Sequence, residues 1–159
     1  MKRGLLALFA LTAAAILLCA CSGKRQTDAP LMRFSFSHSG MHSGLIYTLT
    51  AADTGHGWQA DVSLLCGECM YVLDMSEEDA DRLTALVQEC NLQTWAGFDK
   101  NDPRCRDGTG FSLSMDFADG THVYAEGSNA FPKDYGAAHQ AILAYFDELL
   151  EKNGIPTRI

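Results

Sequence analysis

The middle of the chain carries a period-two alternation of apolar and polar residues, first over residues 45–51 and again over 58–64. Successive side chains of a strand point to opposite faces, so this alternation predicts two half-buried strands, joined by a turn at Asp53-Thr54-Gly55-His56-Gly57. The short apolar run at 70–73 predicts a third strand of the same meander, and residues 32–37 are expected to add a strand at its edge.

After these strands the apolar residues recur at helical spacing. Ser76 and Asp79 stand three residues apart, as in a capping box, where each side chain accepts a hydrogen bond from the other residue's backbone N–H. A helix is therefore expected to begin at Ser76. Its apolar positions form one stripe, which must be covered by a sheet: Ala80, Leu83, Leu86, Val87 and Cys90.

The alternation returns over residues 111–117, and Asp119-Gly120 predicts a hairpin turn into a second strand at 121–126. Pairing about a two-residue turn sets His122 opposite Phe117, on the face of the hairpin that is expected to enter the core.

A last helix is expected from about residue 132 to Asn153-Gly154, where glycine permits a left-handed cap and Ile155 can fold back on the final turn. Its apolar face contains Tyr135, Ala138, Ile142, Tyr145, Phe146 and Leu149.

The predicted order is strands, helix, strands, helix. It indicates an α+β domain with one mainly antiparallel sheet and both helices packed on one face. Residues 44–53 and 110–119 share one pattern, and each is followed by glycine, a returning strand and a helix. This likeness indicates either a duplicated ββα unit or the general similarity of amphipathic hairpins.

The N-terminus differs in kind from this domain, because basic Met1-Lys2-Arg3 precedes an apolar run that ends in small residues. These regions are typical of a secretory signal, although the run at 4–20 also approaches the length of a membrane-spanning helix. The stretch Leu18-Cys19-Ala20-Cys21 resembles the lipobox of bacterial lipoproteins, with an aliphatic residue three places before the cysteine and a small one next to it. The resemblance implies diacylglycerol on the Cys21 sulfur and cleavage just before that residue.

This resemblance divides the chain into a signal peptide at 1–20, a lipidated cysteine with a flexible tether at 21–31, and a single domain at 32–159. It implies an extracytoplasmic protein held by lipid on the bacterial cell membrane or outer membrane. An uncleaved N-terminal anchor and a soluble secreted protein are the alternatives.

The charge of the chain excludes one class of partner. The formal net charge is −8, and removal of residues 1–20 takes away Lys2 and Arg3 but no acid. Nucleic acid is therefore not an expected partner, because its phosphates require clustered basic residues. A small molecule, a cation or another envelope protein remains compatible with this charge.

Four cysteines remain in the domain once Cys19 and Cys21 are set aside: Cys66, Cys69, Cys90 and Cys105. An even number in an exported domain favours structural disulfides, with free thiols, a metal site and redox chemistry as alternatives. The CxxC pair lies between two predicted strands, not at a helix N-terminus, which disfavours redox chemistry. The other two cysteines are not a second CxxC, which disfavours zinc.

No convergent catalytic set is visible, so no catalytic residue, metal or cofactor is expected. His38 and His42 are four apart, but serine and glycine around them predict a mobile loop. Asp53-Thr54-Gly55 matches the aspartic-protease triplet and is explained by a turn. The acidic loop at 98–108 does not follow the calcium-binding EF-hand pattern, because Pro103 occupies a ligand position.

Three loop aromatics, Trp95, Phe98 and Phe131, form a candidate binding patch, with core packing as the alternative. The segments 95–99, 107–113 and 129–132 resemble parts of uncharacterised bacterial lipoproteins, over about the last 65 residues, and this resemblance implies no activity. The sequence therefore predicts a non-enzymatic, lipid-anchored binding or structural protein. A redox or metal protein that uses Cys66 and Cys69 is the alternative.

Overall fold

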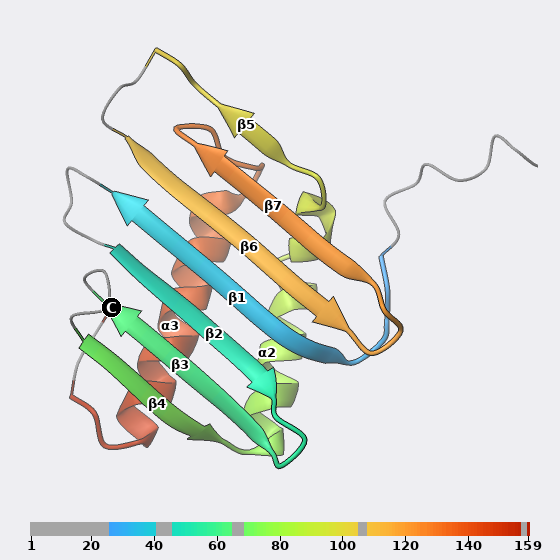
Figure 1. Cartoon of the computed structure of the whole chain (residues 1–159), viewed down its shortest axis with the longest axis vertical. Helices are drawn as coiled ribbons and strands as arrows, with labels where there is room; N and C mark the ends of the chain where they lie inside the picture. The colour runs from blue at the N-terminus through green and yellow to red at the C-terminus, as the bar shows by residue number, and fades with distance from the viewer. Residues whose placement is uncertain (1–25, 41–45, 65–68, 105–107, 157–158) are drawn as a thin grey trace, which may run out of the picture.

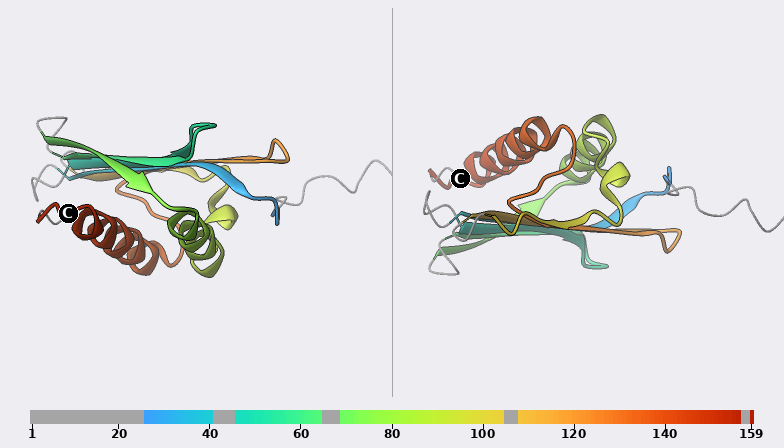
Figure 2. Two further views of the ribbon diagram at one scale, coloured as in Figure 1. Left: turned by 90° about the horizontal axis from the view of Figure 1, so that it is seen from below. Right: turned by 90° about the horizontal axis from the view of Figure 1, so that it is seen from above.

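The computed structural model of the chain describes residues 26–40, 46–64, 69–104, 108–156 and 159. These residues form one seven-stranded sheet with the order β4-β3-β2-β1-β6-β7-β5 (Figure 1). Both long helices lie on the same side of the sheet (Figure 2). The elements are β1 (Leu31–Gly40), β2 (Ile46–Asp53), β3 (Trp58–Leu64), β4 (Cys69–Met75), α2 (Glu77–Glu89), the 3-10 helix η2 (Leu92–Trp95), β5 (Asp99–Asn101), β6 (Thr109–Phe117), β7 (His122–Ser128) and α3 (Tyr135–Lys152).

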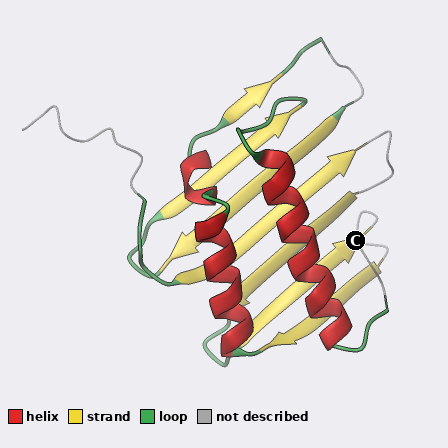
Figure 3. Cartoon of the chain, turned by 180° about the vertical axis from the view of Figure 1, so that it is seen from behind, coloured by secondary structure: helices red, strands yellow, loops and turns green. Residues whose placement is uncertain are grey.

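The expected α+β class is confirmed, and the sheet is larger than the sequence suggested. All neighbouring strands pair antiparallel except β5, which runs parallel to β7. The two helices cross the back of the sheet side by side and leave its other face open (Figure 3). Every strand except the short β5 therefore divides into a buried side under the helices and an exposed side.

Strand β1 is the centre of the sheet, so the prediction of an edge strand at 32–37 was wrong. It pairs with β2 on one side and with β6 on the other, and Phe34 and Phe36 are fully buried. The strand also continues through His38, which was expected in a mobile loop and is instead 9% exposed on the helix side. Its serines lowered the apparent hydropathy because they lie on the open face.

The register of the β6–β7 hairpin differs from the prediction by one residue. His122 lies opposite Asp116, not opposite Phe117, and its exposed ring nitrogen Nδ1 is 2.7 Å from an Asp116 carboxylate oxygen. The loop has three residues, because Phe117 pairs with Thr121 and Gly120 adopts a φ of +80°. Three-residue hairpin loops commonly end in such a left-handed glycine. The change places Val123, Ala125 and Gly127 in the core.

The capping box predicted at the start of α2 is confirmed. The Ser76 hydroxyl accepts from the Asp79 backbone N–H, and the Asp79 carboxylate accepts from the Ser76 N–H at 2.9 Å. The same carboxylate, only 3% exposed, accepts from the Lys152 ammonium at 2.6 Å, and Tyr145 of α3 donates to the Asp79 carbonyl. The buried acid therefore joins the start of α2 to the end of α3.

Helix α3 covers the sheet with the face that its sequence predicted. It ends as expected, because Gly154 has a φ of +75° and the Ile155 N–H donates to the Leu150 carbonyl. The Phe146 ring contacts Phe34 of the central strand at 6.2 Å between ring centroids. The buried residues of α3 are Tyr135, Ala138, Ile142, Tyr145, Phe146, Leu149 and Leu150.

The last part of the segment expected as a flexible tether is docked on the domain. The Thr27 N–H donates to the Gln93 side-chain oxygen at 2.7 Å, and the Gln93 amide donates back to the Thr27 carbonyl at 2.9 Å. The Thr27 hydroxyl donates to Asp119 in the β6–β7 loop, and Leu31 is buried. Residues 27–31 of the predicted tether are therefore held against the domain.

Within the part of the chain that the structure describes, no helix combines the length and the apolar character that crossing a bilayer requires.

Replacing Asp79 with alanine should lower the free energy of unfolding by about 2 kcal/mol at pH 7, because the N–H and hydroxyl of Ser76 lose their shared acceptor and Lys152 loses its buried partner. Urea unfolding followed by circular dichroism measures this change. Glu78→Ala is the matched control, since it removes an exposed carboxylate from the same helical turn and should cost less than about 0.5 kcal/mol.

This contribution should also depend on pH. Burial alone would raise the pKa of Asp79, but hydrogen bonds from Lys152 and Ser76 outweigh it and lower that pKa. The stabilisation is therefore present above the ordinary aspartate pKa and is lost as the pH falls through the lowered value. Equal losses in the Asp79→Ala and Glu78→Ala variants at pH 7 would contradict the role assigned to this carboxylate.

Candidate functional site

The three aromatic residues singled out in the sequence lie around two buried rings at the β5 side of the sheet. Trp95 contacts Phe111 edge-on at 5.8 Å and Tyr135 at 5.7 Å between ring centroids. Phe98 lies 6.0 Å from Phe111, and Phe131 lies 4.5 Å from Tyr135. Phe111 and Tyr135 are themselves 4.8 Å apart, so the five rings form one continuous aromatic cluster.

A groove of about 500 Å³ opens beside this cluster, between η2 and the first turn of α3. Trp95 and Phe98 line one side, and Pro132, Ala137 and Ala138 line the other. Cys90 also lines the groove. The exposed polar residues that complete the lining are Glu89, Asn91, Thr94, Lys133 and Asp134. We call this site the aromatic groove.

The three predicted patch residues differ in how they meet solvent. Trp95 is only 4% exposed, so most of its ring serves the core, whereas Phe98 is half-buried. Phe131 is 38% exposed and covers Phe111 and Tyr135 without lining the aromatic groove. The same cluster thus supplies core packing and an apolar wall that solvent can reach.

Two residues that line the aromatic groove have left-handed backbone. Among the described residues, three that are not glycine have positive φ, and two of them line the groove: Asn91 at 51° and Asp134 at 63°. Asp134 precedes α3, yet its side chain makes no capping hydrogen bond. Asn91 directly follows Cys90, the C-cap of α2, and its N–H donates to the Gln88 carbonyl. A left-handed asparagine at this position is an ordinary helix ending, so this backbone does not by itself mark a functional site.

A cluster of histidine and tyrosine side chains lies next to the aromatic cluster, under the first half of α3. His38 Nδ1 is 3.1 Å from the Tyr135 hydroxyl, and the Tyr47 hydroxyl is hydrogen-bonded to His139 Nε2. The two imidazoles stack at 4.7 Å between centroids, and Tyr47 stacks on His38 at 5.3 Å. Tyr135 therefore belongs to both clusters.

Both histidines of this cluster are held neutral at pH 7. Burial lowers the pKa of His38, and burial together with the neighbouring His38 lowers the pKa of His139 to about 4. Burial also raises the pKa of Tyr135, which keeps its hydroxyl protonated. Neutral imidazole offers one donor and one acceptor, so each ring can pair with a tyrosine hydroxyl.

The sequence did not reveal this cluster, because its members are distant in the chain and no spacing relates them. One sequence signal could have pointed to this cluster. Residues 34, 36 and 38 alternate with serines, which places His38 on the same strand face as the two buried phenylalanines. His42, the other histidine of the predicted loop, lies outside the described residues.

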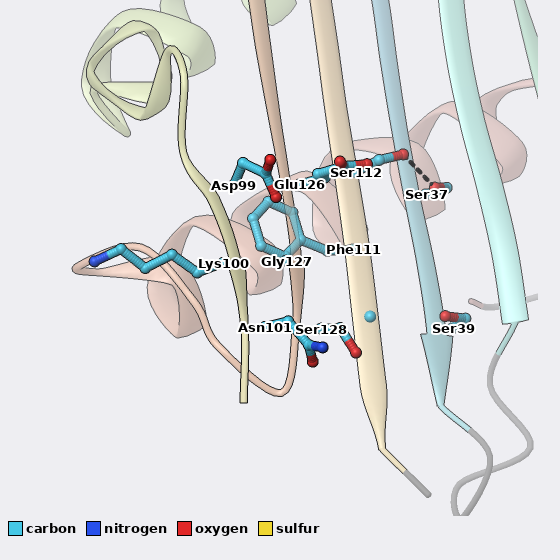
Figure 4. Close-up of a pocket in the computed structure, with 11 residues that line it drawn as sticks. Ser37, Ser39, Asp99, Lys100, Asn101, Phe111, Ser112, Glu126, Gly127 and Ser128 are labelled. Atoms are coloured by element: carbon cyan, nitrogen blue, oxygen red, sulfur yellow. Dashed lines mark hydrogen bonds between the residues drawn. The ribbon is translucent and has the colours of Figure 1, made fainter. Parts of the chain in front are cut away.

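The open face of the sheet carries a second, polar depression of about 390 Å³ over β1, β6, β7 and β5 (Figure 4). Its lining includes the hydrogen-bonded hydroxyl pair Ser37 and Ser112, 2.7 Å apart. Asp99 lies opposite Glu126 at one side. Hydroxyl and charged residues are what the solvent face of a half-covered antiparallel sheet ordinarily presents, so this depression is a weaker candidate than the aromatic groove.

Of the candidate cysteines, Cys90 is the one whose side chain the structure describes. It is a free, half-buried thiol at the end of α2, and burial together with Glu89 raises its pKa, which disfavours the reactive thiolate. Cys66 and Cys105 lie outside the described residues. Residue 69 begins β4 opposite Leu64, so the CxxC pair falls at the β3–β4 connection, as predicted.

Two other motifs have local structural roles in the described part of the chain. The segment Asp53-Thr54-Gly55 is the β2–β3 turn, where the Asp53 carboxylate accepts from the Gly55 N–H. In the acidic loop, Asp102 is paired with Arg104, and no group of three or more His, Cys, Asp or Glu among the described residues could hold a metal ion. Cys21 lies outside the described residues.

The chain matches no known protein family, no curated protein and no solved structure.

The stability of the fold should fall by about 1–2 kcal/mol as the pH is lowered from 6.5 toward 4, on account of His139. Between these values the unfolded chain binds a proton at this residue that the folded chain does not, so acid favours unfolding. Partial exposure of the ring reduces the effect below that of a fully buried group. Urea unfolding at a series of pH values measures it.

The matched variants for this measurement are His139→Phe and His56→Phe. The first should flatten the pH dependence of stability between pH 6.5 and 4, whereas the second, in the exposed β2–β3 turn, should leave it unchanged. An unchanged pH dependence in His139→Phe would contradict the neutral state assigned to this ring.

Proposed function

We propose that this protein is a lipid-anchored, extracytoplasmic binding protein without enzymatic activity, and that the aromatic groove holds its ligand or a side chain of a partner envelope protein. The observation that carries the proposal is the apolar wall of the aromatic groove, with Lys133 and Asp134 beside it. An apolar concavity with a few polar groups beside it is typical of small-ligand sites.

The size and chemistry of the groove indicate what it would accept. A volume of about 500 Å³ is within the range of small-ligand sites, roughly 300–1,000 Å³. Phe98, Pro132 and Ala137 offer the accessible apolar contact area, while Lys133 and Asp134 offer charges of both signs beside it. The expected occupant therefore has an apolar ring or branched chain and a polar group near it. Such anchors dominate binding energy when they fill a pocket.

The docking of the N-terminal segment on the domain supports the proposal that the aromatic groove lies close to the membrane. Thr27 is bound to Gln93 of η2, the 3-10 helix that also carries Trp95. If lipid is attached to Cys21, the intervening residues span at most about 20 Å. The anchor would thus hold the groove near the lipid surface, where membrane proteins are its accessible partners.

Two finer expectations remain part of this proposal. A duplicated ββα unit is supported by the hairpins β2–β3 and β6–β7, each followed by a helix on the same face, although β4 intervenes in the first half. A thiol-redox or metal function for Cys66 and Cys69 has no described side-chain geometry in its favour.

Filling the aromatic groove should abolish binding of an apolar probe. Ala137 is exposed on the first turn of α3 and lines the groove, so Ala137→Trp occupies the space without removing a core contact. Gln140→Trp adds the same ring to an exposed position of α3 outside the groove and is the matched control. The probe is 1-anilinonaphthalene-8-sulfonate, titrated into the native protein and followed by its fluorescence.

Saturable binding is expected for the wild type and Gln140→Trp, with at least a tenfold loss of affinity in Ala137→Trp. Equal affinity in all three proteins would place the probe elsewhere and would remove the support for the groove as a binding site.

Replacing Cys21 with alanine should release the protein from the membrane and prevent cleavage before residue 21. The thioether to diacylglycerol needs the cysteine sulfur, and two or more acyl chains are what hold such a protein firmly. Fractionation of the host and the intact mass of the purified chain measure both effects. Unchanged membrane retention and processing would contradict the lipid anchor and would leave the groove experiment unaffected.

A further inference from the structure

The two edges of the sheet are built very differently. At one edge β5 has only three residues, all exposed, and two of them, Asp99 and Lys100, are charged. Short, charged edge strands discourage pairing with another chain. At the other edge β4 has seven residues, contains neither lysine, arginine nor proline, and has a described strand neighbour on one side alone.

The side chains of β4 are unusual as well. Met70 is 66% exposed and Val72 is 61% exposed, the highest values among the large hydrophobic side chains of the described residues. Residues two apart on a strand share a face, so both lie on the open face of the sheet. Their neighbours on β3 are the polar residues Ser63 and Asp61, so the adjoining strand offers them little apolar cover.

We propose that β4 is a self-association edge, where a second copy of this chain pairs antiparallel with it to form one continuous sheet. An extended strand is what fits such an edge, because it offers backbone donors and acceptors at matching intervals. A two-fold axis perpendicular to the sheet relates the two copies. It keeps both helical layers on one face and both polar faces on the other.

The sequence of β4 selects one register about this axis. Pairing Met70 with Val72 of the partner subunit, twice by symmetry, covers both exposed apolar side chains with each other. It leaves Asp74 beyond the paired apolar residues. The register shifted by two residues, with Val72 opposite Val72 of the partner subunit, would instead set Met70 against Asp74 of the partner subunit.

The size of this contact predicts a weak dimer. A single strand edge buries less than the roughly 800 Å² per partner of a stable interface, so a dissociation constant in the micromolar range or above is expected in solution. Confinement to a membrane raises the local concentration and favours the dimer. This last point rests on the proposed lipid anchor, whereas the pairing of β4 does not.

Photo-crosslinking in the native host tests the proposal on the full chain. Met70→p-benzoylphenylalanine places a reactive ketone at the edge, and Tyr124→p-benzoylphenylalanine is the matched control. Tyr124 is 45% exposed on the same open face, but its strand is flanked on both sides. Irradiation should give a product of twice the chain mass for position 70 and none for position 124. Mass spectrometry should locate the crosslink in residues 69–75 of the second copy.

Two exposed-site variants, Val72→Lys and Val72→Glu, complete the test. Each should reduce the crosslinking yield at position 70 at least fivefold while leaving the melting temperature within a few degrees of the wild type. A crosslink from position 70 to another segment of the same chain, to a different protein, or to nothing would overturn the proposal. Persistence of the dimer when Cys21 is replaced with alanine would support strand pairing even if the lipid anchor proved wrong.

Discussion

The structure depends on the burial of the central strand beneath α3. Phe34 and Phe36 of β1 are fully buried, and Phe146 of α3 packs on Phe34. Full burial of one such ring stabilises the fold by roughly 1.5–3 kcal/mol, which is a large share of the net stability of a small domain. Because the helices cover one face alone, each long strand must send its apolar residues to that face. The alternation of apolar and polar residues along each strand follows from this constraint.

Much of the fold could be predicted because local rules and tertiary packing agree. The capping box at Ser76, the left-handed cap at Gly154 and the apolar face of α3 all depend on residues within one or two helical turns. The central position of β1 could not be predicted, since it depends on pairing with β6, about 75 residues away. The register of the β6–β7 hairpin could not be predicted either, because a two-residue and a three-residue loop are both compatible with Asp119-Gly120.

The candidate site was predictable only in part, for a related physical reason. Aromatic residues in loops indicate either core or surface, and Trp95 belongs to both, because its buried ring also lines the aromatic groove. The neighbouring histidine–tyrosine cluster joins β1, β2 and α3 through pairs of residues more than 90 positions apart. No local pattern encodes such pairs. They follow only when the sheet order is known.

The contact between Thr27 and Gln93 has a mechanical consequence. Two hydrogen bonds hold the peptide of Thr27 against the side chain of Gln93, and a third links its hydroxyl to Asp119. A pull on the N-terminal end of the chain is therefore borne first by η2 and the β6–β7 loop, before it reaches β1. Tension at this end acts on these few bonds, which must break before the central strand carries the load.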